Sequence, residues 1–453
     1  MDADALNEER NASGASSMST RDKSTLAPQL RFPEFRDAEE WTTCNLGHLS
    51  KIVTERVGNN NCIPYTITSG VGLISQQEKL GRTIAGNSLK NYILLQYNDF
   101  AYNKSATKAY PQGYIACYLG NESAAVPNSI FTCFRPDQNV VIPAFLDHLF
   151  SANLHGKWLK NRVAVGARAN GALQVNNDDL MKVPVPLPTG SQSLSEQKKI
   201  ADCLSSLDGL LAVEIEKIYA LNKYKQGLMQ QLFPQEGERI PRLRFPEFQG
   251  DGEWKEKKLG SLATKVGSGI TPLGGEKNYK KSGRPFVRSQ NIGWGELLLD
   301  DVAFIDEETH NSFIATQINL LDVFLNITGA SIGRSAVADS RVVGGNVNQH
   351  VCIIRTTGEL NPIFLNQFLI SKDGQSQIDK CQAGGNRQGL NFSQIKSLTI
   401  PLPTDINEQM KIANVLASVD ALVTSQNKKI EVLKDHKKGL IQQLFPVFGG
   451  ASV

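Results

Sequence analysis

A 40-residue stretch that occurs twice constrains the fold of this chain more than any other feature. Residues Ser195–Pro234 and Asn407–Pro446 align at a constant offset of 212 without a gap, and half of their positions are identical. In each copy apolar residues recur at alternating spacings of four and three, which is typical of a coiled-coil seam. Phe-Pro closes both copies, and proline cannot continue a helix. We therefore predict two long helices that pair with each other; two surface helices packed on separate domains are the alternative, although these rarely keep so strict a seam.

The seam of each copy carries two polar positions, from which we predict the pairing. An antiparallel pair in which polar positions meet brings Glu214 to Lys437 and Lys225 to Gln426. Polar seam residues commonly fix register in this way, because a charge buried against leucine is costly. The predicted interface contains these four residues and the apolar positions Leu207, Leu211, Ile218, Leu221, Leu228, Val423, Ile430, Leu433, Leu440 and Leu444.

A shorter repeat precedes each long segment. LRFPEF stands at Leu30–Phe35 and again at Leu243–Phe248, whereas the interiors 50–140 and 263–358 share almost no residues. A duplicated frame around two divergent interiors suggests one scaffold that presents two specificities. The predicted domains are a disordered tail (1–27, with Met18 as an alternative start), a first globular domain (28–193), a first long helix (194–234), a second globular domain (235–405), a second long helix (406–446) and a tail (447–453).

Within each globular domain, strand-like runs come first and helices later. A proline-led helix follows the strands at Pro143 and again at Pro362, since proline suits the first helical turn. The predicted fold class is α+β, with two pseudo-symmetric α/β domains joined by two long helices that form an antiparallel coiled coil. The predicted strands are Ile63–Thr68, Tyr92–Leu95, Gly113–Leu119, Ser129–Phe134, Pro285–Arg288, Asp322–Ile327, Ser335–Val337 and Val351–Arg355.

Composition and motifs argue against several classes of protein. No apolar run approaches the roughly 20 residues that a membrane span needs. The seven cysteines form no CxxC pair and the six histidines show no metal-ligand spacing, so we expect a reduced, cytoplasmic chain without a metal site. The sequence contains no motif for a phosphate-binding loop and none for a nucleophile elbow. This favours a binding protein over an enzyme. The net charge of +3 neither favours nor excludes nucleic acid.

Three windows combine cations and aromatic residues with an absence of acid, which is the pattern that phosphate neutralisation requires. They lie between Asp99 and Glu122, between Asp147 and Asp178, and between Glu276 and Glu296; Arg387 lies in a fourth. Arg, Asn and Gln pair with base edges, whereas Lys mostly contacts phosphate. The predicted DNA-binding residues are Asn103, Lys104, Lys108, Arg162, Arg168, Asn170, Gly269, Thr271, Lys277, Arg288, Gln290, Asn291 and Arg387.

The order and duplication of these motifs resemble a known family, the DNA-specificity subunits of type I restriction–modification enzymes. The resemblance rests on the WxxxxLG segments that begin at Trp41 and Trp254, the two PLP exits, the EQxKIAxxL helix starts, and the loops GSGITP (Gly267–Pro272) and TGASIG (Thr328–Gly333). It covers essentially everything after the N-terminal tail. The first domain lacks a clear counterpart of GSGITP, so the resemblance is weaker there.

The resemblance implies a non-catalytic, sequence-specific subunit that reads a split target in double-stranded DNA, one half with each domain, across a non-specific spacer. It implies as partners methylation subunits, expected to number two, and restriction/translocation subunits, but no membrane. No cofactor is expected in this chain, whereas S-adenosylmethionine, ATP and Mg are expected in the partner subunits. The alternative hypothesis is a two-domain protein–protein adaptor without nucleic-acid binding.

Overall fold

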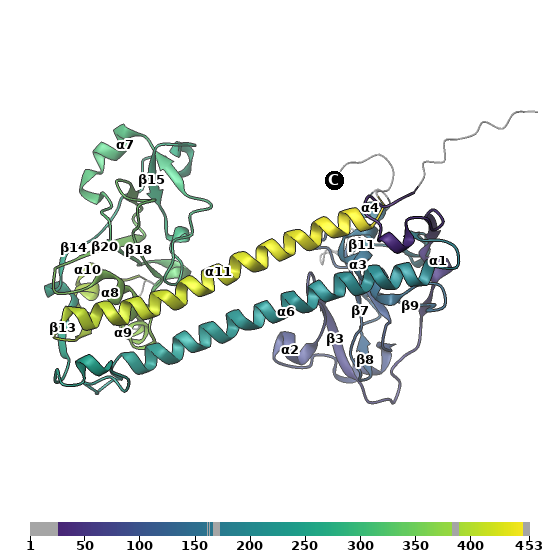
Figure 1. Cartoon of the computed structure of the whole chain (residues 1–453), viewed down its shortest axis with the longest axis horizontal. Coiled ribbons are helices and arrows are strands. Elements are labelled where there is room, and N and C mark those ends of the chain that lie inside the picture. Colours follow the sequence, from purple (N-terminus) through teal and green to yellow (C-terminus); the bar gives the residue numbers. More distant parts are fainter. Residues whose placement is uncertain (1–25, 161, 163, 166–172, 383–388, 447–453) are drawn as a thin grey trace, which may run out of the picture. The chain divides into compact units, whose positions relative to one another are not determined.

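The computed structural model describes residues 26–160, 162, 164–165, 173–382 and 389–446. The chain forms two compact units (Figure 1): unit 1 contains Met1–Ala212 and Val432–Val453, and unit 2 contains Val213–Glu431. The predicted domain boundaries, which set each long helix apart, stay a prediction. The predicted tail lies outside the described residues except for Leu26 and Ala27, and Leu26 forms a β-bridge with Trp41. Over the described part, none of the helices is long and apolar enough to cross a membrane.

The globular part of unit 1 is built on two four-stranded sheets. Their strand orders are β2-β9-β6-β7 and β4-β3-β8-β5, and a separate ribbon pairs β1 with β12. Its strands are β1 (Thr42–Asn45), β2 (Ser50–Val53), β3 (Ile63–Thr68), β4 (Gly72–Ser75), β5 (Ile93–Leu95), β6 (Phe100–Asn103), β7 (Tyr114–Cys117), β8 (Ala124–Val126), β9 (Phe131–Pro136), β10 (Ala164–Val165), β11 (Leu173–Gln174) and β12 (Pro184–Leu187). Its short helices are α1 (Leu46–Leu49), α2 (Gln76–Leu80), α3 (Pro143–Ser151), α4 (Leu154–Leu159) and α5 (Asn177–Met181).

Unit 2 repeats the first of these sheets with the order β14-β20-β17-β18 and the ribbon as β13 with β21, and it adds a three-stranded sheet, β16-β15-β19. Its strands are β13 (Lys255–Lys258), β14 (Ala263–Ser268), β15 (Arg284–Val287), β16 (Ala303–Ile305), β17 (Val323–Asn326), β18 (Ser335–Val337), β19 (Asn346–Val347), β20 (Val351–Thr356) and β21 (Thr399–Leu402). Its short helices are α7 (Glu307–Ser312), α8 (Pro362–Leu369), α9 (Lys372–Gln382) and α10 (Phe392–Ser397). The eight predicted strands and both proline-led helices are confirmed.

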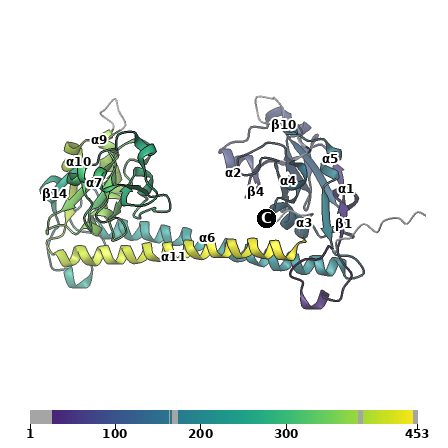
Figure 2. The ribbon, with the colours of Figure 1, turned by 90° about the horizontal axis from the view of Figure 1, so that it is seen from above.

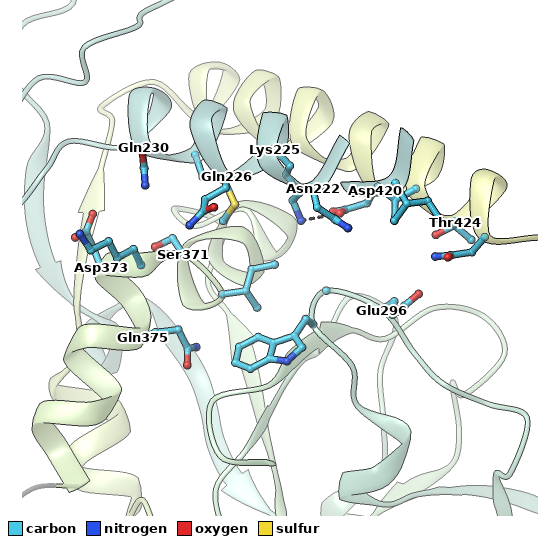
Figure 3. A pocket seen from close by; sticks show the side chains of 18 residues that line it. Asn222, Lys225, Gln226, Gln230, Glu296, Ser371, Asp373, Gln375, Asp420 and Thr424 are labelled. Carbon is cyan, nitrogen blue, oxygen red and sulfur yellow. Dashed lines mark ion pairs between the residues drawn. The ribbon is translucent and has the colours of Figure 1, made fainter. Parts of the chain in front are cut away.

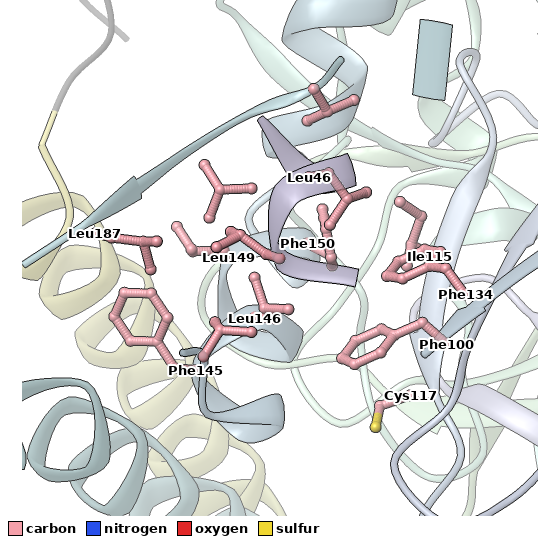
Figure 4. Close-up of a cluster of buried hydrophobic side chains, with 14 of the residues drawn as sticks. Leu46, Phe100, Ile115, Cys117, Phe134, Phe145, Leu146, Leu149, Phe150 and Leu187 are labelled. Atoms are coloured by element: carbon pink, nitrogen blue, oxygen red, sulfur yellow. The ribbon is translucent and has the colours of Figure 1, made fainter. Parts of the chain in front are cut away.

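Aromatic side chains fill the core between the main sheet of unit 1 and helix α3 (Figure 4). Phe100 and Phe134 stack at 5.2 Å between ring centroids, and Phe150 meets both rings edge-on. The last turn of the second long helix adds Leu444 and Phe445 to this core. In unit 2 the corresponding Phe233 packs against Trp254 and Phe364. The Phe-Pro that ends each long helix is therefore an anchor in a core as well as a stop signal.

The LRFPEF motif holds the first turn of a long helix in each unit. In unit 2 the guanidinium of Arg244 donates to both carboxylate oxygens of Glu408 at 2.8 Å, and the two side chains are only 6% and 1% exposed. In unit 1 Arg31 makes the same bidentate contact with Glu196 at 2.7 and 2.8 Å. A bidentate, charge-assisted pair of this kind is among the stronger polar contacts in proteins. It explains why the motif recurs with each helix start.

The glutamine that follows each of these glutamates joins the helix start to the globular part. Gln197 accepts a hydrogen bond from the backbone N–H of Ile142, just before α3, and donates to Val140 O. Gln409 does the same in unit 2, with the N–H of Asn361 and Glu359 O. Each side-chain amide thereby pairs with a backbone N–H and a backbone C=O just before a short helix, where backbone N–H groups lack a partner within the helix. The Glu-Gln dipeptide of EQxKIAxxL is thus explained residue by residue.

The predicted seam lies on two long helices (Figure 1 and Figure 2). These are α6 (Ser193–Leu232, 40 residues) and α11 (Ile406–Leu444, 39 residues). Every predicted seam position is buried or half-buried, whereas most of the positions between them are exposed. In unit 2, Glu214 contacts Gln426 while Lys225, further along α6, contacts Asp420, earlier in α11. The chain directions are therefore opposite, and the predicted antiparallel coiled coil is confirmed.

The predicted register of this coiled coil is wrong by about one heptad. Lys437 pairs with Asp208 at 2.5 Å within unit 1, and Lys225 pairs with Asp420 at 2.6 Å within unit 2. Glu214 accepts hydrogen bonds from Gln426 and from Lys429. The prediction matched polar seam positions with one another, whereas both seam lysines find aspartates that lie one position beyond the seam. Each lysine is neutralised by its aspartate, so this alignment leaves neither lysine buried with an unpaired charge.

Candidate nucleic-acid interface

Several loops of unit 2 converge at one end of the β14-β20-β17-β18 sheet. The GSGITP loop leaves β14 there, and Gly269 N–H donates to Asn348 O at 3.2 Å. The end of β15 joins them, since Asn348 N–H donates to Val287 O at 3.0 Å. Thr328, which follows β17, forms a bridge with Gly389, which stands two residues after Arg387 in the fourth predicted window. Segments from five parts of the sequence, three of them predicted to bind DNA, therefore meet at this end of the sheet, which we call the unit 2 edge.

Arg288 lies at this edge, but its guanidinium is held by neighbours. It stacks over Tyr279 at 5.4 Å, donates to Asp301 O at 2.5 Å, and pairs with the Asp301 carboxylate at 3.2 Å; the side chain is 11% exposed. Gln290 is exposed, and its amide donates to the same carboxylate at 2.6 Å. Asp301 therefore neutralises the positive charge of Arg288 at this edge. Arg288 and Gln290 would both have to release Asp301 before they could contact a base.

Three further predicted residues of unit 2 occupy different environments. Asn291 is 1% exposed, and its amide holds the turn through hydrogen bonds with Arg288 N–H, Leu298 O and Asp301 O, so its side chain supports the turn and does not face a ligand. A Cβ on Gly269 would lie 1.6 Å from Val347 O, so the chain's own packing requires this glycine. Thr271 is half-buried and Lys277 is exposed in the same loop region.

In unit 1 the predicted residues lie around the β6 strand and helix α4. Asn103 and Lys104 are half-buried at the end of β6, where burial lowers the pKa of the Lys104 ammonium. Lys108 is exposed in the following loop. Arg162 stacks on Trp158 with 3.4 Å between its guanidinium carbon and the ring centroid. The predicted residues Arg168, Asn170 and Arg387 lie outside the described part of the chain.

Sequence reasoning missed a polar chain that the structure reveals at the edge in unit 2. Gln349 is exposed, and its amide nitrogen lies 3.3 Å from Nε2 of His350; Nδ1 of that ring lies 2.6 Å from the Thr328 hydroxyl. The backbone of this turn is fixed, because His350 N–H donates to the Asn348 side chain and His350 O accepts from Ile327 N–H. A usable signal was present, since no acidic residue stands between Asp339 and Glu359.

A hollow of about 700 Å³ opens between the long helices and the globular part of unit 2 (Figure 3). The Lys225–Asp420 ion pair lies on its helical wall, and Gln375 of α9 faces it from the globular part. Trp294, at the tip of a turn, lines the hollow and is 53% exposed. Polar and apolar side chains both line the hollow. Among the described residues, no cluster of three or more His, Cys, Asp or Glu could hold a metal.

Comparison with known proteins gives a consistent picture. The family "Type I restriction modification DNA specificity domain" matches residues 39–223 and 251–435. The chain is 24% identical to the type I restriction enzyme MjaVIII specificity subunit of Methanocaldococcus jannaschii over 307 residues, which are 65% of this chain and 68% of that protein. It is also 24% identical over 336 residues to the putative MjaX specificity subunit of the same organism, covering 73% of this chain and 74% of that one.

Solved structures show the same fold. The type I restriction–modification S subunit from M. genitalium superposes with a TM-score of 0.56 at 14% identity, covering 93% of this chain and 100% of that one. A chain from a structure that addresses complex assembly and conformational transition of the type I system has a TM-score of 0.52 at 18% identity and covers 90% of this chain and 97% of that one. The two family matches cover most of the sequence, one in each repeat, so the resemblance inferred from the motifs is confirmed. The chain belongs to the family of type I restriction–modification DNA specificity subunits, which are non-catalytic.

Proposed function

We propose that this chain selects a bipartite DNA target, with unit 1 reading one half-site and unit 2 the other across a non-specific spacer. The observation that carries the proposal is the convergence in unit 2 of three separately predicted DNA-binding segments at one end of a sheet. The same sheet order recurs in unit 1, where the loops differ in sequence and length. A shared frame with different loops suits two readers of different half-sites.

We further propose that the chain directs partner subunits that carry the chemistry. Two methylation subunits and the restriction/translocation subunits would hold S-adenosylmethionine, ATP and Mg, while this chain holds none of them. The relatives support this assignment, because they are named as specificity subunits and one related structure concerns complex assembly. Within unit 2 the hollow beside Trp294 offers a mixed surface on which a methylation subunit would dock.

The decisive experiment compares methylated motifs in host DNA with the gene present, deleted and restored. We expect one bipartite motif to lose its methylation on deletion and to regain it on restoration. Purified chain should bind a duplex carrying that motif in a gel shift, with affinity falling steeply as salt rises, because phosphate contacts release counterions. An unchanged set of methylated motifs together with salt-insensitive or absent DNA binding would favour the protein–protein adaptor instead.

The predicted contacts are tested by substitutions at the unit 2 edge. Arg288→Ala or Arg387→Ala should relax one half-site and leave the other unchanged, since a bidentate arginine–guanine contact contributes roughly 1–3 kcal/mol of discrimination. Because Asp301 already holds Arg288, Asp301→Asn should strengthen overall DNA binding by removing a competing negative charge. Equal changes in both half-sites would contradict the division of labour between the units.

A further inference from the structure

A hydrogen-bonded network joins Thr328, His350 and Gln349, and the side chain of Gln349 is exposed. The Gln349 amide nitrogen can only donate, so Nε2 of the His350 ring accepts and an N–H stands at Nδ1. Nδ1–H then donates to the Thr328 hydroxyl at 2.6 Å. The amide N–H thereby selects the tautomer of the ring, and the hydroxyl holds the ring in place from its other nitrogen.

The exposed amide keeps two groups available for a ligand. One N–H and the carbonyl oxygen of Gln349 have no partner within the part of the chain that the structure describes. A side-chain amide with one free donor beside one free acceptor matches the N7 acceptor and N6 donor of adenine in the major groove. Guanine presents two acceptors at the same edge and therefore leaves the amide oxygen unmatched.

Further hydrogen bonds hold the backbone of this network in place, as a group that distinguishes bases requires. His350 is tied by its backbone to the end of β17 and to the Asn348 side chain, and Asn348 is 7% exposed. Neighbouring backbone bonds connect the same turn to the GSGITP loop and to the segment before Arg288. A reading group whose neighbours fix its rotamer loses little entropy on binding and so distinguishes bases better than a loose one.

We propose that Gln349 reads an adenine in the half-site of unit 2, with His350 and Thr328 as positioning residues. This inference rests on the proposed function and deepens it by naming a base and the residue that recognises it. Arg288 and Gln290 differ from Gln349 in that each donates to Asp301, which places a negative charge beside them, whereas Gln349 donates to an imidazole nitrogen.

The test is a selection from a duplex library randomised at every base pair of the target, using the full chain in complex with its methylation subunits. Gln349→Ala should lower the preference for adenine at one position of one half-site by roughly ten- to a hundredfold. Gln349→Glu should instead move the preference at that position toward cytosine, because a carboxylate accepts a hydrogen bond from cytosine N4. Gln249→Ala, a change at an exposed glutamine after LRFPEF, serves as the matched control and should leave the motif unchanged.

Conservative variants separate positioning from simple loss of structure. Thr328→Val removes the hydroxyl while keeping the shape, and it should weaken discrimination at the same base as Gln349→Ala, whereas Thr328→Ser should restore it. Thermal unfolding of each variant must match that of the parent chain. An unchanged motif for Gln349→Ala, or a change at a base other than adenine, overturns the inference while leaving the proposed function standing. Failure of the parent chain to select any bipartite motif would overturn the proposed function itself.

Discussion

At the scale of single residues, the two units use the same few charged side chains to join their parts. The Arg31–Glu196 and Arg244–Glu408 pairs secure helix starts, and the Arg135–Asp99 and Arg355–Asp322 pairs tie strands of the main sheets. All four carboxylates are 1% exposed or less. Charges this deeply buried are tolerated only when each one keeps its partner. The interiors diverged in sequence, but these pairs did not.

Loss of one partner from the Arg244–Glu408 pair should be strongly destabilising. We expect Arg244→Ala to lower the free energy of unfolding of unit 2 by about 3–5 kcal/mol, because Glu408 is left buried and charged. Arg31→Ala should cost less, since Glu196 keeps a hydrogen bond from Trp41 Nε1 at 3.2 Å whereas Trp254 Nε1 makes no such bond. Urea unfolding measures both. The double substitution Arg244→Met with Glu408→Leu should recover much of the loss, and equal effects of the two single arginine changes would contradict this explanation.

Glu214 should make the helix pair sensitive to acid. Hydrogen bonds from Lys429, Gln426 and Lys217 lower the pKa of the Glu214 carboxyl to about 2. Since the folded chain holds this proton less tightly than the unfolded chain, the stabilisation is present above the ordinary pKa near 4.5 and is lost as pH falls toward 2. Thermal unfolding at several pH values between 7 and 3 should show a smaller acid-dependent decrease for Glu214→Gln than for the parent chain. Parallel pH profiles would show that the carboxyl contributes nothing.

At the scale of secondary-structure elements, the sequence predicts which segments form helices and strands better than it predicts how these segments pair. The seam of α6 and α11 was predictable because a 3.5-residue period is a local property of the sequence. The register was not, since Asp208 and Asp420 lie outside the seam and their lysine partners stand more than 190 residues away. The ribbon of β1 with β12 was also missed, because the prolines of β12 resemble a loop; in a two-stranded ribbon they are tolerated at the edge.

The candidate interface shows the same division between local and long-range information. The acid-free window between Glu276 and Glu296 is visible in the sequence, and the structure brings its segment next to the turn that also contacts the GSGITP loop; that these segments bind DNA stays a prediction. Which side chains remain available was not visible, since the Asp301 that engages Arg288 and Gln290 follows them by more than ten residues. Gln349 was overlooked although it lies beside His350 in an acid-free stretch, because the hydroxyl that holds the His350 ring belongs to Thr328, 22 residues earlier.

The lysine–aspartate pairs between the long helices should contribute according to their burial. In unit 2, Asp420 neutralises Lys225, which is 8% exposed, and accepts a hydrogen bond from the buried Gln367 at 2.8 Å. Asp420→Ala leaves both groups without this partner and should lower the free energy of unfolding by about 1–3 kcal/mol. Asp208→Ala should cost less, because Asp208 is 46% exposed. Chemical denaturation decides the order, and a larger effect for Asp208→Ala would contradict it.

At the scale of the whole molecule, each long helix belongs to both units. The first turns of α6 contribute Ile200 and Leu204 to the core of unit 1, and its end contributes Leu232 and Phe233 to the core of unit 2. Helix α11 does the reverse, with Ile412 and Leu416 in unit 2 and Leu444 in unit 1. Each globular core therefore uses residues from both helices. Unit 2 is continuous in sequence, whereas unit 1 is completed by the last part of the chain.

Because α6 is one unbroken helix that enters both cores, we expect its length to set the spacer between half-sites. Inserting one heptad after Leu221, with a matching heptad in α11, keeps the apolar stripe in phase and adds roughly 10 Å at about 1.5 Å per residue. The altered chain should select the same half-sites with a spacer longer by about three base pairs.

The control for this experiment changes the phase of the stripe. A four-residue insertion at the same place rotates the seam out of phase, so it should abolish selection or yield another spacing. Site selection from a library with variable spacers measures both variants. If the heptad variant kept the parental spacer, the helices could not be the element that fixes the spacing.

The contact between Glu214 and Gln426 records how such a chain could have arisen. The two residues occupy equivalent positions of the repeat and touch each other. In an ancestral pair of identical half-length chains, this position would have met its own copy, where two glutamines can share hydrogen bonds but two buried glutamates repel. A single chain that contains both copies has no such restriction, because one copy can change while the other stays as it is. A glutamate at position 214 is thus compatible with a joined chain and would have been selected against in a separate, self-pairing half.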